Sequence, residues 1–293
     1  MSLRSPPAER SPVERLNFGV LNLDKPPGPS AHQVAAWVRD LAAVDQAAHA
    51  GTLDPKVTGC LPMLLGEATR MAQVFDDSEK AYVAVLELHD RVNERDLERV
   101  AAEFEGEIYQ KPPKKSAVVR RLRTRGIRSL DVLEVEDRQA LLRIRCESGT
   151  YIRKLCHDLG LALGTGAHMG DLRRVATEPF DDRDLVTLHD FVDALAFWRE
   201  DDDPAPLQEV VQPAEHALRD VPSVTIAESA AREVAEGAPV YAPGVLDADD
   251  LDPATEPLVA CYTPNGAAVC LGTFVGDPDA ATGTVVDLER VLV

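Results

Sequence analysis

Aromatic residues and lysines are scarce in this sequence, and long apolar runs are missing. Phe, Trp and Tyr make up 5% of the 293 residues, and lysine supplies only seven of the 31 basic side chains. No apolar run approaches the roughly 20 residues that cross a bilayer. The first residues, polar and rich in proline, predict no secretory signal. We therefore expect a cytoplasmic protein with no membrane partner.

Cysteine is also sparse and lacks a paired pattern. The five cysteines show no CxxC spacing, and an odd number in a chain without a secretion signal argues against a disulfide framework. Histidines could join cysteines around zinc, yet no pair has the short spacing from which a zinc site is built. We expect reduced thiols and no metal. The residues concerned are Cys60, Cys146, Cys156, Cys261, Cys270, His49, His157 and His168.

The composition is that of a globular protein, with 45% hydrophobic and 28% charged residues, and the length predicts two domains. A net charge of −19 would normally repel nucleic acid. However, residues 181–293 hold 24 Asp and Glu against five Arg, so residues 1–180 are balanced. This acidic excess is typical of proteins solvated in concentrated salt, where a Debye length of roughly 3 Å at 1 M screens repulsion from RNA.

One segment of the balanced part is strongly basic. KPPKKSAVVRRLRTRGIR, residues 111–128, contains eight basic residues and no acid. A solvated charge run usually mixes both signs, so we favour contact with nucleic-acid phosphates over that simpler interpretation. The predicted RNA contacts are Lys111, Lys114, Lys115, Arg120, Arg121, Arg123 and Arg125.

Hydrophobic periodicity predicts the elements of the first part of the chain. Residues 1–16 read as a flexible arm, followed by a short strand over 20–23 and a helix whose N-cap is Ser30. HAGTLDP, residues 49–55, falls in a loop. VTGCLPMLLGEATRMAQVF, residues 57–75, reads as an apolar helical region broken by Pro62.

The next elements alternate less regularly. KAYVAVLELH reads as a strand buried on both faces, ALLRIRCES as a half-exposed strand, and the run from Ile152 to Leu163 as an amphipathic helix stopped by glycines. A charged helix is expected over 94–104. Strands and helices in this order predict an α+β fold, with a mixed, largely antiparallel sheet flanked by helices.

Acidic, partly helical sequence with the linker-like run EDDDPAP leads into a last compact unit. That unit has short strands and a helix over 228–236 ended by Gly237, and we expect it to be a small separate domain. The domains predicted are therefore an arm over 1–16, a large domain over 17–215 and a C-terminal domain over 222–293.

Five stretches between residues 18 and 180 carry a family resemblance. In order they are LNLDKPPGPSAHQV, HAGTLDPKVTGCLPMLLGEATR, KAYVAVLELHDRV, GEIYQKPPKKSAVVRRLRTR and CESGTYIRKLCHDLGLALGTGAHMGDLRR. Together they resemble the TruB-type pseudouridine synthases, in particular the archaeal dyskerin-like branch. SVTIAESAAREVAEGAPVYAPGV, within residues 222–293, resembles a PUA domain, the RNA-binding module that follows the catalytic domain in that branch. The resemblance implies that residues 17–215 form the catalytic domain and that residues 222–293 form a small, β-barrel-like domain.

The resemblance implies an enzyme that isomerises uridine to pseudouridine in RNA, with no cofactor. It further implies the catalytic subunit of an H/ACA guide ribonucleoprotein that modifies ribosomal RNA. Its partners would be the guide RNA, small accessory proteins and a kink-turn-binding protein. Action without a guide on the T-loop uridine of transfer RNA remains open. The alternative is a catalytically silent RNA-binding scaffold of the same fold.

The resemblance also implies site residues. Asp54 corresponds to the carboxylate that acts on the sugar, either as nucleophile or as base. Tyr82 corresponds to the tyrosine that stacks on the extruded base. Arg153 corresponds to the arginine that pairs with the catalytic carboxylate, which a guanidinium can hold by a two-point fork.

Three further positions have supporting roles in this resemblance. Leu172 corresponds to the apolar wall of the uracil pocket, and His49 to a histidine that assists base flipping. Extruding a base costs a few kcal/mol, which contacts of this kind must return. Lys25 corresponds to a motif that packs beside the active-site loop, so we expect it to support that loop rather than take part in the chemistry.

Taken singly, these residues have simpler interpretations. Asp54 before a proline is a good helix N-cap, and Tyr82 on a strand is typical of a core residue. Arg153 could pair with Glu147 or Asp158 instead. The joint order of the motifs along the chain is what favours a catalytic site.

Overall fold

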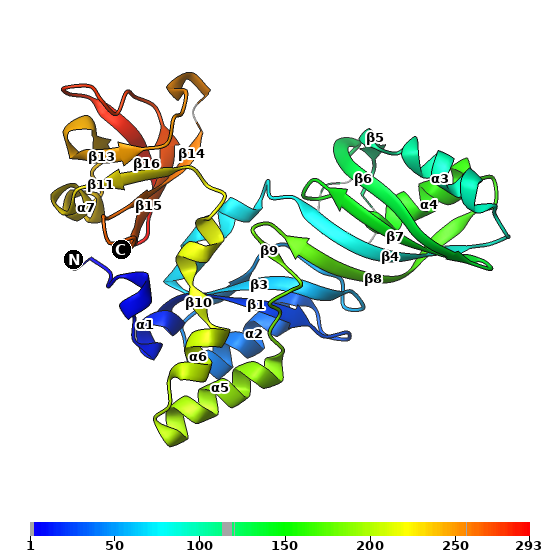
Figure 1. Cartoon of the computed structure of the whole chain (residues 1–293), viewed down its shortest axis with the longest axis horizontal. Helices are drawn as coiled ribbons and strands as arrows, with labels where there is room; N and C mark the ends of the chain where they lie inside the picture. Colours follow the sequence, from blue (N-terminus) through cyan, green and yellow to red (C-terminus); the bar gives the residue numbers. More distant parts are fainter. Residues whose placement is uncertain (1–2, 113–118, 120, 256) are drawn as a thin grey trace.

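A computed structural model describes residues 3–112, 119, 121–255 and 257–293 of the chain. They form a large sheet with helices around it and a smaller C-terminal sheet, which lies at the upper left in Figure 1. Lys114, Lys115 and Arg120, three of the predicted RNA contacts, lie outside the described residues.

The large sheet has ten strands in the described part of the chain, in the order β10-β1-β3-β8-β4-β7-β6-β5, with β2 beside β3 and β9 beside β8. Among its described strand pairs, only β3 and β8 run parallel. The predicted mixed, largely antiparallel sheet is thus confirmed. Its strands are β1 (Phe18–Lys25), β2 (Ala47–His49), β3 (Thr58–Gly66), β4 (Lys80–Leu88), β5 (Gly106–Gln110), β6 (Arg123–Glu136), β7 (Gln139–Cys146), β8 (Ala167–Thr177), β9 (Phe180–Asp181) and β10 (Gln212–Pro213).

Helices flank this sheet as predicted (Figure 1). The helix expected after Ser30 begins there, because the Ser30 hydroxyl accepts the N–H of Gln33 at 3.2 Å. The helices are α1 (Pro12–Asn17), α2 (Ala31–Ala42), α3 (Glu94–Ala102), α4 (Ile152–Ala162), α5 (Leu188–Asp201), α6 (Ala205–Val210) and α7 (Glu228–Ala235), with 3-10 turns η1 (Pro7–Glu9), η2 (Glu67–Phe75), η3 (Ala214–Leu218), η4 (Ala242–Gly244) and η5 (Pro253–Thr255).

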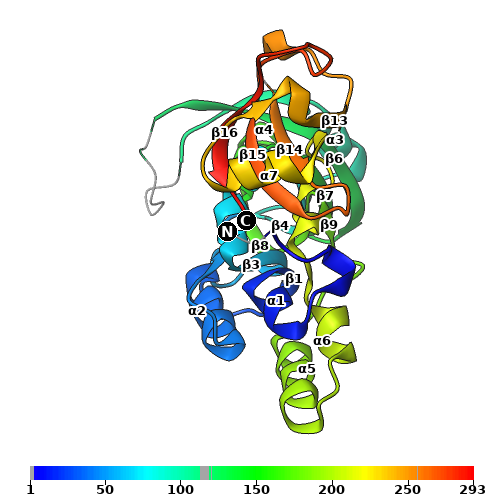
Figure 2. The same cartoon turned by 90° about the vertical axis from the view of Figure 1, so that its left-hand side faces the viewer.

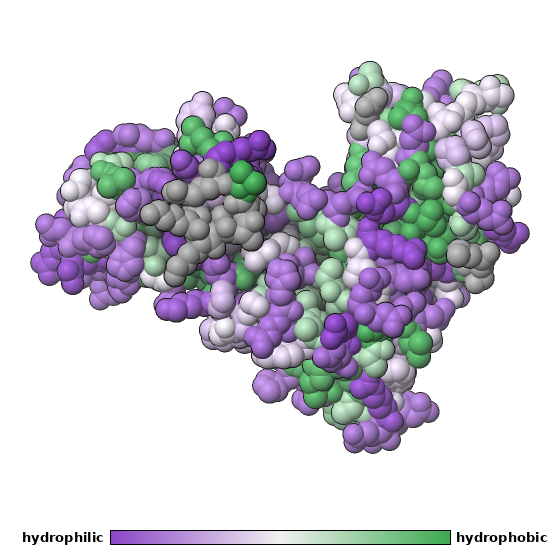
Figure 3. Space-filling model, turned by 180° about the vertical axis from the view of Figure 1, so that it is seen from behind, coloured by the Kyte–Doolittle hydropathy of each residue, from purple (hydrophilic) through white to green (hydrophobic). Residues whose placement is uncertain are grey.

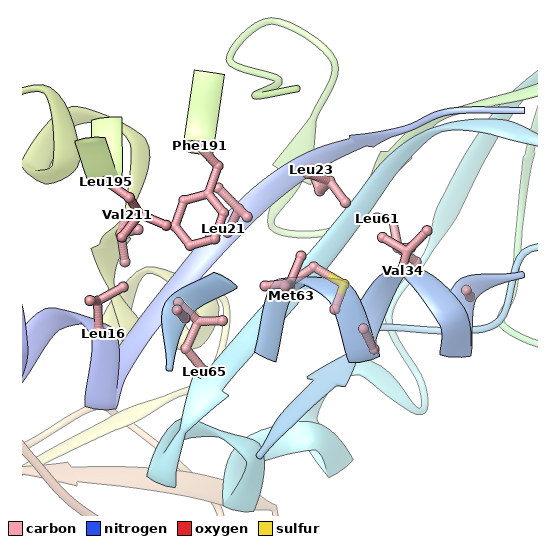
Figure 4. Packing of buried hydrophobic residues seen from close by; sticks show 14 of the residues in the cluster. Leu16, Leu21, Leu23, Val34, Leu61, Met63, Leu65, Phe191, Leu195 and Val211 are labelled. Carbon is pink, nitrogen blue, oxygen red and sulfur yellow. The ribbon is translucent and has the colours of Figure 1, made fainter. Parts of the chain in front are cut away.

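The core beneath the expected catalytic loop is made by two strands and two helices. Leu21 and Met63 of β1 and β3 meet Val34 of α2 and Phe191 of α5, as Figure 4 shows, and all four are fully buried. Burying one such side chain stabilises the fold by about 1.5–3 kcal/mol. This packing therefore gives the loop a rigid base.

The helical region predicted over residues 57–75 is wrong for its first half. Residues 58–66 form β3, which pairs with the whole of β1, and only the second half is helical, as the 3-10 turn η2. A short apolar run buried on both faces has no period that separates a strand from a helix. Pro62 fits because its carbonyl faces away from β1 and accepts the N–H of Ala50 at 2.8 Å. The N–H that proline lacks would also face away from β1, so no hydrogen bond between β1 and β3 is lost.

Other predicted elements are confirmed with one change. The strand at ALLRIRCES, the charged helix and the amphipathic helix appear as β7, α3 and α4. In β4, however, Ala84 and Leu86 are buried while Val83 and Val85 are only half-buried. The strand is therefore packed mainly on one face, and not on both as predicted.

The predicted flexible arm is also corrected. Residues 3–16 contain η1 and α1, and Arg10 is only 2% exposed. Its guanidinium forks onto Glu215, and Arg4 contacts Glu67 and the carbonyl of Leu292. The N-terminal segment thus joins the large sheet to the last residues of the chain, and Figure 2 shows the two termini side by side.

The C-terminal sheet has the strand order β12-β16-β15-β14-β11-β13 in the described residues and is barrel-like. Helix α7 packs against it and ends before Gly237, close to the predicted position. Its strands are β11 (Ser223–Ile226), β12 (Val240–Tyr241), β13 (Val245–Ala248), β14 (Leu258–Tyr262), β15 (Ala268–Phe274) and β16 (Thr284–Val291). Leu271 and Leu292 share one core with Phe18 and Leu64 of the large sheet. The domain boundaries at 215 and 222 stay a prediction.

Seen from behind, most of the surface is hydrophilic, and it is hollowed between the C-terminal barrel and the lobe that contains β4 to β7 (Figure 3). None of the helices in the described residues has the length and apolar character needed to span a membrane. The five cysteines are free and buried. The described residues contain no cluster of three metal-ligating side chains.

Candidate active site

Asp54 stands at the top of the loop that joins β2 to β3. Its neighbours Leu53 and Val57 are buried in the core under α2, and Ala50 is buried in the core shared with the barrel. The side chain of Asp54 itself is 54% exposed. Apolar residues on both sides therefore fix the loop and leave the carboxylate facing outward.

Lys25 holds the end of this loop from below. It is fully buried, and its ammonium donates to the carbonyls of Pro26 at 2.9 Å, Pro55 at 3.1 Å and Val57 at 2.9 Å. Burial lowers the pKa of Lys25, and no carboxylate pairs with it in the described residues. These contacts hold the backbone at the end of the loop, and the supporting role of Lys25 stays a prediction.

Arg153 forms an ion pair with Asp54 across 99 residues of sequence, and half of its side chain is exposed. It lies in the first turn of α4, whose N-cap Tyr151 makes no side-chain cap. Instead, the buried amide of Gln110 accepts the Tyr151 N–H at 2.9 Å and donates to the Tyr151 carbonyl at 3.2 Å. Gln110, which the sequence did not single out, thus fixes the start of the helix that carries Arg153.

Tyr82 and Leu172 lie on the neighbouring strands β4 and β8, where Leu172 is opposite Ala84 and Tyr82 is opposite Arg174. Both side chains are half-buried, and each contacts the core under α2 and the core under α4. Burial raises the pKa of Tyr82, although the nearby Arg174 cation opposes this. The tyrosine is therefore neutral at physiological pH.

His49 ends β2, directly before the loop. Its ring meets that of His32 edge to face, with 4.7 Å between the centroids, and both line a cavity of about 400 Å³ between α2 and β2. Burial, followed by the charges of His32 and Arg174, lowers the pKa of His49. Its Nδ1 is buried without a hydrogen-bond partner in the described residues.

Arg174 is the main residue that sequence reasoning missed. It is 1% exposed and donates to the carbonyls of Ala50, Gly51 and Cys60. Its only signal in the sequence is its place in GDLRR, two residues after Leu172. Lys80, also missed, is buried beside it, and burial lowers the pKa of Lys80 to about 8.

The basic run is described only in part. Lys111 and Arg121 are exposed, and Arg123 and Arg125 are half-buried near the start of β6. None of these four forms an ion pair within the described residues, unlike the last residue of the run, Arg128, which pairs with glutamates. Arg123 and Arg125 each donate a hydrogen bond to a backbone carbonyl instead, and the contact of all four residues with RNA stays a prediction.

Two domain models of one protein family match this chain between residues 39 and 219. The N-terminal domain of TruB family pseudouridylate synthases matches residues 39–152, and the C-terminal domain of tRNA pseudouridylate synthase B matches residues 153–219. A probable tRNA pseudouridine synthase B of Halobacterium salinarum is 67% identical over the full length of both chains. The chain belongs to the TruB family of pseudouridylate synthases. A relative of the same name from Haloarcula marismortui is 65% identical over all of this chain and 94% of that one.

Solved structures place this TruB family member more narrowly. The chain of a Cbf5-Nop10-Gar1 complex is 44% identical, covers 100% of this chain and 90% of its own, and superposes with a TM-score of 0.92. A chain of an H/ACA ribonucleoprotein bound to a substrate RNA containing 2'-deoxyuridine is 41% identical over 99% and 90%, with a TM-score of 0.92. The resemblance to the dyskerin-like branch is thereby confirmed.

Proposed function

We propose that this protein isomerises specific uridines to pseudouridine in RNA as the catalytic subunit of an H/ACA guide ribonucleoprotein, in the cytoplasm. The Asp54–Arg153 ion pair supports this most directly. The ion pair places a carboxylate on the exposed side of the loop, and the guanidinium fixes the direction of that carboxylate. The loop backbone is held on its buried side.

Each site residue has a separate role in the proposed reaction. Asp54 acts at the anomeric carbon, where the bond to the uracil nitrogen breaks and a bond to carbon later forms. Tyr82 stacks on the extruded base, and Leu172 walls the uracil pocket. His49 assists flipping, while Lys25 supports the loop. Arg153 aims the carboxylate until substrate arrives. No cofactor takes part.

Partners follow from the solved relatives, which contain Nop10, Gar1 and substrate RNA. The guide RNA would select the uridine in ribosomal RNA by base pairing, and small accessory proteins and a kink-turn-binding protein would complete the particle. The C-terminal barrel would anchor the guide RNA as a PUA domain. The basic residues at and before the start of β6, which have no carboxylate partner in the described residues, would contact phosphates.

Modification of transfer RNA without a guide is a second function. It is supported by the names of the relatives at 67% and 65% identity, which are probable tRNA pseudouridine synthases. The two functions use one site and differ only in how the target uridine is selected.

The test compares the wild type with Asp54→Asn, which keeps the size of the side chain and removes its charge. Pseudouridine formation is measured in molar potassium chloride, on unmodified transfer RNA and on a guide-paired ribosomal RNA fragment with accessory proteins. Wild type should react and the variant should not, while both bind RNA equally. A variant that turns over would remove Asp54 from its role, and an inactive wild type with normal RNA binding would favour a silent scaffold.

A further inference from the structure

Arg174 joins the two ends of the catalytic loop. Its Nε donates to the carbonyl of Cys60 in β3 at 2.7 Å, and its Nη2 donates to the carbonyls of Ala50 at 3.0 Å and Gly51 at 3.3 Å. Ala50 and Gly51 begin the loop, and Cys60 follows it. One guanidinium therefore fixes the backbone on both sides of Asp54.

The same guanidinium reaches the base-stacking candidate. Arg174 lies opposite Tyr82 in the pairing of β8 with β4, so the two side chains emerge on the same face of the sheet, and the Arg174 cation is near enough to oppose the rise in the pKa of Tyr82. A single side chain thus contacts the start of the loop and the strand after it, and it is the cross-strand neighbour of the tyrosine.

The contacts need a guanidinium rather than any cation. Arg174 has no carboxylate partner in the described residues, whereas its neighbour Arg173 forks onto Asp24 at 2.9 and 3.0 Å. A buried cation is costly unless its donors are satisfied. Arginine has five N–H donors in a fixed plane, and lysine has one nitrogen on a flexible stem, so lysine cannot reproduce the set.

The loop is shaped to the guanidinium in return. Gly51 has φ +79°, and a Cβ there would lie 3.1 Å from Nη1 of Arg174. Only glycine adopts this conformation easily and leaves room for the approach. The close fit indicates that small movements of Arg174 would displace the loop.

We propose that Arg174 is a positioning residue that sets the place of Asp54 relative to Tyr82. It acts through the backbone of residues 50–51 and 60 and through its place opposite Tyr82 in the sheet, and it touches no reacting atom. The inference rests on the proposed function, because the two groups it aligns are the proposed carboxylate and the base-stacking ring. A misplacement of about 1 Å can cost on the order of 100-fold in rate.

The activity test uses Arg174→Lys, with Arg173→Lys as the matched control, under single-turnover conditions. Arg174→Lys should slow the reaction by about 10- to 100-fold with RNA affinity unchanged, while Arg173→Lys stays close to wild type. Tyr82→Phe keeps the ring and removes the hydroxyl. Since Arg174 sets the place of the neighbouring Tyr82, the two residues act as a unit, and the double variant should lose less than the product of the two single losses. Equal losses in both lysine variants, or multiplicative losses in the double variant, would overturn the proposal.

Amide hydrogen exchange of the free protein provides a readout that needs no activity. Exchange over residues 50–57 should quicken in Arg174→Lys and stay unchanged in the barrel strands. If the lysine variant does not fold, Arg174→Gln serves instead, because it removes the buried cation together with the guanidinium donors to the carbonyls of Ala50 and Cys60 and should quicken the same segment. Wild-type exchange in this segment would overturn the inference. An inactive wild type would count against the proposed function alone, since the exchange result stands independently.

Discussion

Replacing Glu215 with alanine should destabilise the protein far more than loss of a surface ion pair would. Arg10 and Glu215 are 1% and 10% exposed in their side chains, and the guanidinium forks onto both carboxylate oxygens at 2.7 and 2.6 Å. Glu215 also accepts the N–H of Ala268, the first residue of β15, at 3.0 Å. The carboxylate therefore ties the N-terminal segment to the C-terminal barrel.

The magnitude follows from what the substitution leaves behind. Glu215→Ala leaves a buried guanidinium without a counter-charge, which typically costs about 3–5 kcal/mol. The surface pair of Arg91 with Asp137 is 80% and 57% exposed, so Arg91→Ala should cost only about 0–1 kcal/mol. Equilibrium unfolding in urea at fixed potassium chloride, followed by circular dichroism, measures both free energies of unfolding.

A double variant separates the charge from the packing. Changing Arg10 and Glu215 both to methionine removes the buried charge together with its partner, and should recover most of the stability that Glu215→Ala removes. The reasoning would be refuted if Glu215→Ala cost no more than Arg91→Ala. A double variant as unstable as the single one would show that shape, and not charge, holds the segment.

Two further predictions concern the basic run and the histidine before the loop. Changing Lys111, Arg121, Arg123 and Arg125 to glutamine should weaken RNA binding and flatten the slope of log affinity against log salt by about 0.7–0.9 for each phosphate that is no longer neutralised; titrations across potassium chloride measure this, and an unchanged slope would place the RNA-binding cations elsewhere. His49 has a pKa below 6.5, so the unfolded chain takes up its proton at a higher pH than the folded one. The folded state therefore loses stability as pH falls below that value. Compared with His49→Gln, the wild type should lose free energy of unfolding between pH 7 and 5, and parallel pH curves would contradict this.

Periodic and capped segments could be predicted from the sequence. Helix α2 has a serine N-cap and an apolar stripe, and β7 alternates buried leucine and isoleucine with exposed arginines. The segment over 57–75 could not be, because β3 is buried on both sides by α2 and by the core shared with the barrel. A run with no polar face lacks the period by which either element is recognised.

The packed N-terminal segment could not be predicted either. Its sequence is polar and proline-rich, and its order depends on partners that are far away in the chain. Arg10 meets Glu215, and Arg4 meets Glu67 and stacks over the ring of Phe18, with 4.0 Å from the guanidinium carbon to the centroid. Contacts of this kind leave no mark in local composition, so the segment resembles a loose arm until the fold is known.

Some residues of the candidate site could likewise be predicted from the sequence, and others could not. Motifs predict Asp54, Tyr82 and Arg153 as site residues, because their residue types stand in a recognisable order, and the fold brings Asp54 and Arg153 together. Arg174 and Gln110 were missed, since each acts on main-chain groups of another segment. A backbone carbonyl is present at every residue and carries no sequence signal. Residues that position a loop or a helix through the backbone are therefore visible only in the fold.

One strand contact explains why these segments meet at all. In a sheet that is otherwise antiparallel among its described strand pairs, β3 and β8 run parallel at Thr58 and Gly59, opposite Arg173 and Arg174. A Cβ at Gly59 would lie 2.2 Å from the carbonyl oxygen of Arg174, and its φ of +97° also requires glycine. This glycine lets the strand that leaves the Asp54 loop approach Arg174, which holds that loop. The glycine of the VTGC stretch is thus part of the site's construction, although it contributes no side chain to its chemistry.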